Sequence, residues 1–100
     1  MKTYLILYDI SNNKSRNLVV KQLKRSGFYR IQKSVFMGAT TQTYLQDLKE
    51  LFDSLLQKED AQFDTYLILP LNELNLKQME IFNLKIDLTL ITARKIVIFV

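Results

Sequence analysis

Few residues of this chain have side chains that could carry out chemistry, and the most prominent of them is Asp9. It directly follows the apolar segment YLILY (residues 4–8), and the next acidic residue is Asp47. The chain contains no cysteine and no histidine, which excludes disulfides, thiolate zinc sites and imidazole general bases. Chemistry must therefore come from carboxylates, lysine, tyrosine or hydroxyl groups, or from a metal ion held by oxygen ligands.

Basic residues dominate the acid-free stretch that follows Asp9. Residues 10–46 contain seven bases and no acid, whereas residues 47–64 contain six acids and two lysines. The seven bases are Lys14, Arg16, Lys21, Lys24, Arg25, Arg30 and Lys33. Two interpretations stay open: two solvated helix faces of opposite charge, or a positive surface that contacts phosphates.

The size and composition of the chain predict one globular domain spanning residues 1–100. It is 48% hydrophobic and 24% charged, with a net charge of +4. The lack of cysteine favours a reducing, cytoplasmic setting. Asp9 interrupts the first apolar run too early for a signal peptide, and no apolar run is long enough to span a bilayer, so no membrane association is expected.

Apolar runs predict the strands that would position these residues. The expected strands are residues 2–10, 28–39, 63–69 and 95–100. Within the second, Lys33–Ser34 predicts a break that divides it into two short strands. Pro70 is expected to close the third, because proline cannot donate a hydrogen bond to a strand ladder.

Apolar residues at helical spacing predict the elements between the strands. The expected helices are a basic helix over residues 14–26, a second helix over residues 44–56 and a short one over residues 75–82. Ser11–Asn13 and Thr41–Thr43 supply N-cap side chains for the first two, and Gly27 fits just after the end of the first. Residues 83–94 show no clear pattern.

The order β-α-β-β-α-β predicts an α+β, ferredoxin-like domain with an extra C-terminal strand. Two helices cover only one face of such a sheet, yet the first strand is apolar on both faces. The uncovered face would be a large apolar patch, so a second copy of the chain is expected to cover it. The uncharged end IVIFV (residues 96–100) is expected to pair with a sheet edge of its own or a partner chain.

Three features taken together resemble a known family. They are YDIS at residues 8–11, Arg16 in the basic helix, and RIQKSVFMG at residues 30–38. This combination resembles the small dimeric CRISPR-associated endoribonuclease family, which partners the integrase during spacer acquisition. The resemblance covers residues 1–70 well and the tail loosely. In two departures, Leu18 stands where some relatives carry a second helix arginine, and Lys33 replaces a common tyrosine.

The resemblance implies a two-fold homodimer with sheets stacked face to face, in which the strand at about residues 95–100 extends the partner's sheet. It also implies that Asp9 is the catalytic, metal-binding acid and pairs with its symmetry mate to hold Mg²⁺ or Mn²⁺. A lone carboxylate is too little for such an ion, but two-fold symmetry supplies two. A metal-activated water would then be the nucleophile, since the chain has no histidine.

Further roles come from the same resemblance or from residue type. The resemblance implies that Tyr8 lies near the catalytic site, and that Arg16, Arg30 and Phe36 lie near it or at nucleic acid. By their charge, Lys14, Lys21, Lys24 and Arg25 together suit a phosphate backbone. Ser34 could contact phosphate or a metal-bound water. Structural alternatives stay open: Asp9 could simply begin the turn after its strand, Tyr8 and Phe36 could be core residues, and the helix cations could be solvated.

Two main hypotheses of function result. The first is a CRISPR adaptation protein that is a Mg²⁺-dependent endonuclease acting on duplex DNA or single-stranded RNA. The alternative is a non-catalytic, dimeric DNA-binding scaffold that holds CRISPR integrase dimers apart. A weaker alternative is a toxin-type ribonuclease of the same fold. The sequence does not choose between RNA and DNA as the substrate.

Overall fold

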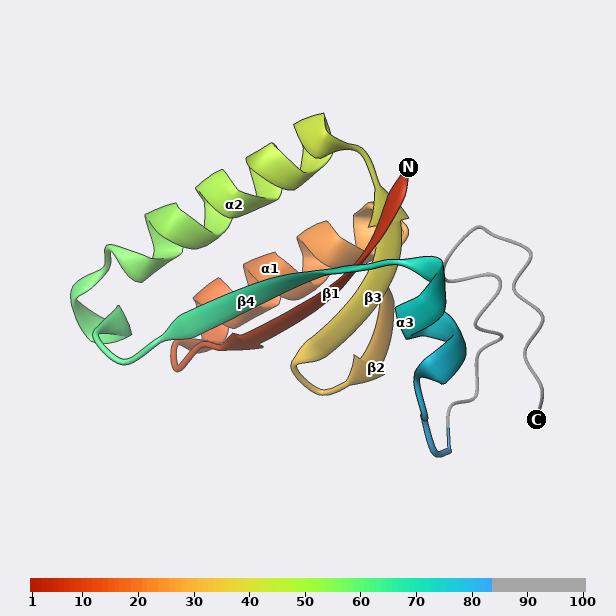
Figure 1. Cartoon of the computed structure of the whole chain (residues 1–100). Coiled ribbons are helices and arrows are strands. Elements are labelled where there is room, and N and C mark those ends of the chain that lie inside the picture. Colours follow the sequence, from red (N-terminus) through yellow and green to blue (C-terminus); the bar gives the residue numbers. More distant parts are fainter. Residues whose placement is uncertain (84–100) are drawn as a thin grey trace.

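The computed structural model describes residues 1–83, which form one four-stranded sheet with three α-helices and a short 3-10 helix. The elements are β1 (Lys2–Asp9), α1 (Asn13–Arg25), β2 (Tyr29–Gln32), β3 (Val35–Thr40), α2 (Gln42–Leu56), η1 (Glu59–Ala61), β4 (Thr65–Leu71) and α3 (Glu73–Gln78). The strands lie in the order β2-β3-β1-β4, and all neighbouring pairs are antiparallel (Figure 1). This confirms the ferredoxin-like α+β fold.

The first two helices begin and end where local chemistry predicts. The Asn12 side chain accepts a hydrogen bond from the Ser15 N–H at 3.0 Å and caps α1. Gly27 follows this helix with a φ of 82°, a conformation that favours glycine because it has no Cβ. The Thr41 hydroxyl accepts a hydrogen bond from the Tyr44 N–H at 3.2 Å and caps α2. Both predicted helices are confirmed, with small shifts of their ends.

The strands predicted within residues 1–83 are confirmed, with shifts of one or two residues at their ends. The predicted break at Lys33–Ser34 is confirmed as the turn between β2 and β3. The prediction that Pro70 closes its strand is wrong, because β4 continues to Leu71 and Pro70 lies opposite Tyr4. Within the described residues β4 is an edge strand, and an edge strand tolerates a residue that has no N–H.

The short third helix lies earlier than the predicted residues 75–82. Asn72 and Asn75 exchange hydrogen bonds between side chain and backbone N–H, at 2.8 Å and 3.3 Å. This capping box starts α3 at Glu73. No helix within residues 1–83 is long and apolar enough to cross a membrane. The strand predicted over residues 95–100 lies outside the described residues.

α1 and α2 cover one side of the sheet, which we call the helix side (Figure 1). Tyr4, Ile6 and Tyr8 of β1 point into the core there, and each is 5% exposed or less. Phe36 of β3 and Phe52 of α2 are fully buried beside them. Burial of each large apolar side chain contributes about 1.5–3 kcal/mol, so this cluster is the main source of stability.

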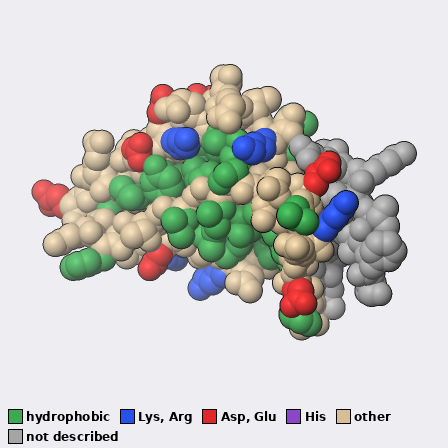
Figure 2. Space-filling model, in the orientation of Figure 1, with side chains coloured by type: hydrophobic (Ala, Val, Ile, Leu, Met, Phe, Trp, Pro, Cys, Tyr) green, Lys and Arg blue, Asp and Glu red, His purple; other side chains and the backbone are tan. Residues whose placement is uncertain are grey.

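The other side of the sheet carries an apolar surface that we call the open face, formed by Leu5, Leu7, Val35, Leu67 and Leu69. Leu67 and Leu69 are 59% and 45% exposed, respectively. Figure 2 shows hydrophobic side chains gathered over β4, β1 and β3 on this side. The expectation that the first two helices leave one face uncovered is confirmed. α3 packs over one end of that face.

Candidate functional site

Asp9 is the last residue of β1, and its side chain lies on the side of the open face. Strand side chains alternate between faces, so Asp9 lies with Leu5 and Leu7 and opposite to Tyr8. The carboxylate is exposed and makes no hydrogen bond or ion pair within residues 1–83. Backbone pairing with Thr65 of β4 holds its main chain in the sheet. The Asp9 carboxylate is therefore open to solvent on a backbone that the sheet holds.

A single chain supplies only one carboxylate at this position. Among the residues that the structure describes, no group of three or more acidic side chains could share a metal ion. Mg²⁺ binds through one or two carboxylates and completes its shell with waters and substrate phosphates. The residues present therefore fit such an ion if a second copy of the chain contributes its own Asp9, as two-fold symmetry would allow.

Two acidic side chains hold the loop between Asp9 and α1. Asp64 Oδ1 accepts hydrogen bonds from the Ser11 backbone N–H at 3.1 Å and from the Ser11 hydroxyl at 2.9 Å. Asp60 Oδ2 accepts one from Asn12 Nδ2 at 2.8 Å. No local sequence pattern marks either acid, because their partners are 53 and 48 residues away in the chain.

Arg16 turns back from α1 toward the same loop. Its Nη1 donates a hydrogen bond to the Ile10 carbonyl at 3.0 Å, and its Nη2 donates one to Asn13 Oδ1. The side chain is half-buried. A guanidinium carries five N–H donors, so these two bonds leave others that could bind a phosphate. The structure therefore places Arg16 beside the end of β1, in the region of Asp9.

Tyr8, Arg30 and Phe36 meet on the helix side and support the turn between β2 and β3. Arg30 donates to the Lys33 carbonyl from Nε at 3.1 Å and from Nη2 at 2.8 Å, and the Tyr8 hydroxyl donates to the same oxygen at 3.5 Å. The Arg30 guanidinium lies 5.6 Å from the centre of the Phe36 ring. The Tyr8 ring stacks on Phe36 with a centroid separation of 6.3 Å. Ser34 joins this arrangement through its carbonyl, which accepts from the Tyr8 N–H at 3.1 Å.

These contacts change how three predicted site residues are interpreted. Phe36 is 0% exposed, so a base has no ring face to stack on, and we assign Phe36 to the core. Arg30 is exposed, but two of its N–H groups already donate to the Lys33 carbonyl in the turn. Burial raises the pKa of Tyr8 above 10.0, against the lowering effect of the Arg30 and Arg16 charges. The phenol is therefore protonated at neutral pH. Its side chain lies on the opposite side of the sheet from that of Asp9.

The three predicted lysines of α1 are exposed, as is Arg25; we call these four residues the basic stripe: Lys14, Lys21, Lys24 and Arg25. Lys14 and Lys24 are ten residues apart, which is about 15 Å along a helix. Leu18, 50% exposed, interrupts this surface. The stripe is long enough to contact more than one phosphate. It lies on the helix side, whereas the Asp9 carboxylate lies on the side of the open face.

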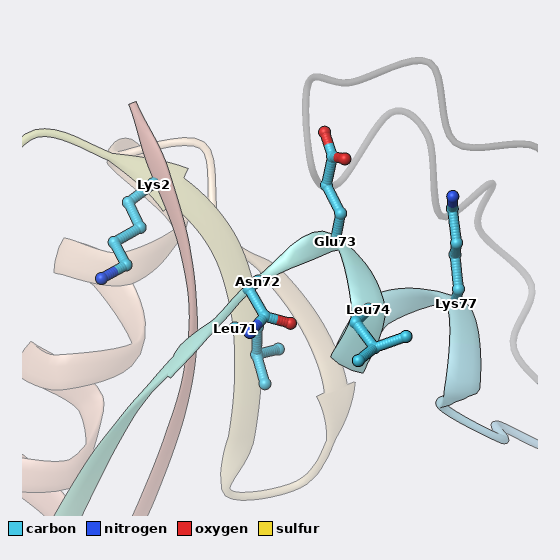
Figure 3. A pocket seen from close by; sticks show the side chains of 6 residues that line it. All are labelled: Lys2, Leu71, Asn72, Glu73, Leu74 and Lys77. Atoms are coloured by element: carbon cyan, nitrogen blue, oxygen red, sulfur yellow. The ribbon is translucent and has the colours of Figure 1, made fainter.

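Asp9 lines neither of two surface hollows among residues 1–83. One of about 540 Å³ lies between the start of β1 and α3, and Figure 3 shows Glu73 and Lys77 projecting from α3 in the same direction there. Lys2, which lines this hollow, is the first residue of β1, and Asp9 is the last. The two residues therefore lie about 23 Å apart along the strand. Another, of about 610 Å³, lies on the open face beneath the residues that follow α3.

The family model and the relatives that match this chain carry the same family name. The chain matches the family model described as CRISPR associated protein Cas2 over residues 1–79. The CRISPR-associated endoribonuclease Cas2 1 of Francisella tularensis subsp. novicida is 47% identical over 64 residues, 64% of this chain and 66% of that protein. The CRISPR-associated endoribonuclease Cas2 1 of Methanospirillum hungatei is 42% identical over 48% of this chain and 50% of that protein. The matches thus span less than two thirds of the length of these two relatives.

Solved structures agree with the fold. The hypothetical protein TT1823 from Thermus thermophilus has a TM-score of 0.65 and 29% identity, and the match covers 83% of this chain and 92% of that one. Streptococcus pyogenes Cas2 at pH 6.5 has a TM-score of 0.66 and 22% identity, with 81% and 99% covered. At that identity the second structure supports the fold alone.

Proposed function

Because the chain belongs to the CRISPR associated protein Cas2 family, we propose that it acts in CRISPR adaptation as a homodimeric, metal-dependent endonuclease on RNA or DNA phosphodiesters. The observation that carries this proposal is Asp9. It is an exposed carboxylate at the end of the apolar open face, with no partner in residues 1–83. The name endoribonuclease, which relatives at 47% and 42% identity carry, supports the nuclease class.

The open face is where we place the dimer contact. Its side chains form the cross-strand pair Leu5-Leu69 and the cross-strand row Val35-Leu7-Leu67. Asp9 and Thr65 form the next pair along β1 and β4. Two copies stacked through these rows would remove apolar surface from water, at about 25 cal/mol per Å², and could bring two Asp9 side chains to one axis.

Each charged group has a separate role in this proposal. The two Asp9 carboxylates would hold Mg²⁺ or Mn²⁺, which when bound activates water and neutralises phosphodiester charge. Lys14 and Arg16, at the start of α1, would hold phosphates near that end of the sheet. Lys21 and Lys24 would follow the nucleic acid backbone without reading its sequence.

The alternative is a non-catalytic scaffold that binds duplex DNA between integrase dimers. The observation that favours it is the position of the basic stripe, on the helix side of the sheet. DNA that follows α1 would not need to reach the Asp9 carboxylate on the other side. In this alternative Asp9 contributes nothing to DNA binding beyond its negative charge.

Cleavage by an Asp9→Asn variant separates the two functions. The amide keeps the shape of the side chain but removes the charge that attracts a cation, so the fold and the dimer should persist. We expect divalent-dependent cleavage of RNA or DNA to fall at least about 100-fold, while salt-sensitive DNA binding remains. Nuclease assays of purified protein with Mg²⁺, Mn²⁺ or EDTA measure this.

Asp47→Asn is the matched control, because it removes the same charge from an exposed position on α2. It should cleave as wild type does. Cleavage that survives Asp9→Asn would place the active site elsewhere. A wild-type protein that cleaves neither RNA nor DNA in either cation would leave the scaffold as the function.

A further inference from the structure

A buried carboxylate that the proposed function does not use lies next to the Asp9 site. Asp64 is 9% exposed, and its Oδ1 accepts two hydrogen bonds from Ser11, at 3.1 Å from the backbone N–H and 2.9 Å from the hydroxyl. The following residue, Thr65, pairs with Asp9 across β1 and β4. The dipeptide Asp64-Thr65 therefore contacts the chain on both sides of Ile10, at Asp9 and at Ser11.

We propose that Asp64 is a positioning residue for Asp9: by fixing Ser11, it keeps the end of β1 in one conformation and the Asp9 carboxylate in one place. This inference rests on the proposed function. The last residue of a strand opens easily unless the residues beyond it are also held. Hydrogen bonds to a carboxylate are stronger than those between neutral groups, and the burial of Asp64 keeps water from competing for them.

The other contacts of this loop differ from those of Asp64 in burial or in the element that they hold. Asp60 accepts a hydrogen bond from Asn12, whose side chain caps α1. That bond is exposed to solvent and acts on the start of the helix. Arg16 holds the Ile10 carbonyl from the helix side of the loop. Asp64 differs from both, because it is buried and its neighbour Thr65 pairs with Asp9 itself.

Asp64→Ala tests the proposal because it removes both hydrogen bonds of Ser11. We expect the Mn²⁺ affinity of the dimer, measured by electron paramagnetic resonance, to fall about 10- to 100-fold, as for other supports of metal ligands. The kcat for cleavage should fall in parallel. KM for nucleic acid should stay within about twofold, because Asp64 supplies no phosphate contact. The Ser11 backbone N–H should exchange with solvent at least about tenfold faster.

Two comparison variants separate position from charge. Asp64→Asn keeps an oxygen that can accept from the Ser11 N–H, so its Mn²⁺ affinity should stay within about threefold of wild type. Asp60→Ala removes the same charge and an exposed bond to the same loop, and should also stay within about threefold. Equal losses in Asp64→Asn and Asp64→Ala would overturn the proposal, because they would assign the effect to the charge of Asp64.

Folded Asp64→Ala with the Mn²⁺ affinity and Ser11 exchange of wild type would also overturn it. If Asp64→Ala does not fold, Asp64→Leu decides, because it removes both acceptor oxygens but keeps a side chain of similar size: a lower Mn²⁺ affinity supports the positioning role, and an unchanged one overturns it. Failure of the proposed function gives a different result, in which wild type and Asp9→Asn bind Mn²⁺ equally. Exchange of the Ser11 N–H then decides alone whether Asp64 fixes this loop.

Discussion

Neighbouring residues at the end of β1 have different surroundings, and this follows from the alternation of strand side chains. Tyr8 points into the helix-side core and donates a hydrogen bond to the Lys33 carbonyl. Asp9 points to the other side and is exposed. The two predicted catalytic residues are therefore separated by the sheet. On this geometry Tyr8 supports the β2–β3 turn, and of the two side chains only the Asp9 carboxylate is open to solvent on the side of the open face.

The raised pKa of Tyr8 predicts a loss of stability at high pH. Burial raises this pKa above 10.0, so the unfolded chain releases the phenol proton at lower pH than the folded protein does. The contribution to unfolding free energy is full below about pH 10 and is lost as pH rises through the folded-state pKa. Tyr8→Phe should therefore lose less stability than wild type between about pH 8 and about pH 10.5.

Urea unfolding of both proteins at each pH measures this difference. At about pH 8 the substitution should cost less than about 1 kcal/mol, because the hydrogen bond to the Lys33 carbonyl is long, at 3.5 Å. The same loss of stability with pH in both proteins would contradict the prediction.

At the scale of elements, α1 joins the core and the basic surface in one helix. Its buried residues Ser15, Val19 and Leu23 face the sheet, and the basic stripe lies on its exposed surface. No acidic residue lies in its first turn, and the acids near it, Asp60 and Asp64, come from the segment before β4. A phosphate backbone can therefore approach α1 without meeting a negative charge from the helix itself.

Reversal of charge on α1 should weaken DNA binding equally for all sequences. Lys21→Glu/Lys24→Glu removes two phosphate contacts, so the slope of log affinity against log salt should become shallower by about 2. Fluorescence anisotropy with two unrelated duplexes between about 50 and 200 mM salt measures the slope. Lys2→Glu/Lys77→Glu has the same net charge but alters exposed lysines away from α1, and its slope should equal that of wild type. Equal slopes for both variants would contradict the proposed interface.

β3 packs closely against the residues that follow α1, and Gly38 makes this possible. A Cβ at Gly38 would lie 2.7–2.9 Å from three atoms of the Phe28 ring. Gly38→Ala should therefore destabilise the fold by about 1–3 kcal/mol, measured by urea unfolding. Gly27→Ala is the comparison: no atom lies within 4 Å of its Cβ position, and the φ of 82° alone should cost about 1 kcal/mol. A Gly38→Ala protein as stable as wild type would contradict this packing.

At the scale of the whole molecule, the two sides of the sheet serve different partners in our proposal. The helix side is closed by α1 and α2 and carries the basic stripe. The open face is apolar, with Leu67 and Leu69 exposed and Asp9 at its end. Exposed apolar patches of this kind mark contact surfaces in soluble proteins. A second copy that covers the open face would also complete the carboxylate pair.

A charge on the open face should prevent the dimer without unfolding the protomer. Leu69→Lys places a cation where the side chain is already 45% exposed, so protomer stability should change by less than about 0.5 kcal/mol. Light scattering at micromolar concentration should give the mass of a dimer for wild type and of a monomer for the variant. Leu18→Lys, at a 50% exposed position on α1, should remain a dimer. A dimeric Leu69→Lys would move the contact away from the open face.

The sequence by itself determined the features that depend on neighbouring residues. Alternation along β1 placed Tyr8 on one face and Leu5 and Leu7 on the other. Caps and Gly27 limited the helices, and Lys33–Ser34 separated two strands. These signals are local, because helical and strand periodicity and capping act within a few positions. The order of the elements was therefore enough to predict the ferredoxin-like fold.

Only the tertiary structure decided which distant groups meet. Packing places Asp64 on Ser11, 53 residues away, engages Arg30 at the turn and buries Phe36 completely. It also makes β4 an edge strand among the described residues, so that Pro70 fits within it. A hydrogen-bond partner or a buried ring depends on how elements dock, and no spacing within one element encodes that. For this reason Asp9 was recognisable in the sequence, whereas the residue that we propose holds it in place was not.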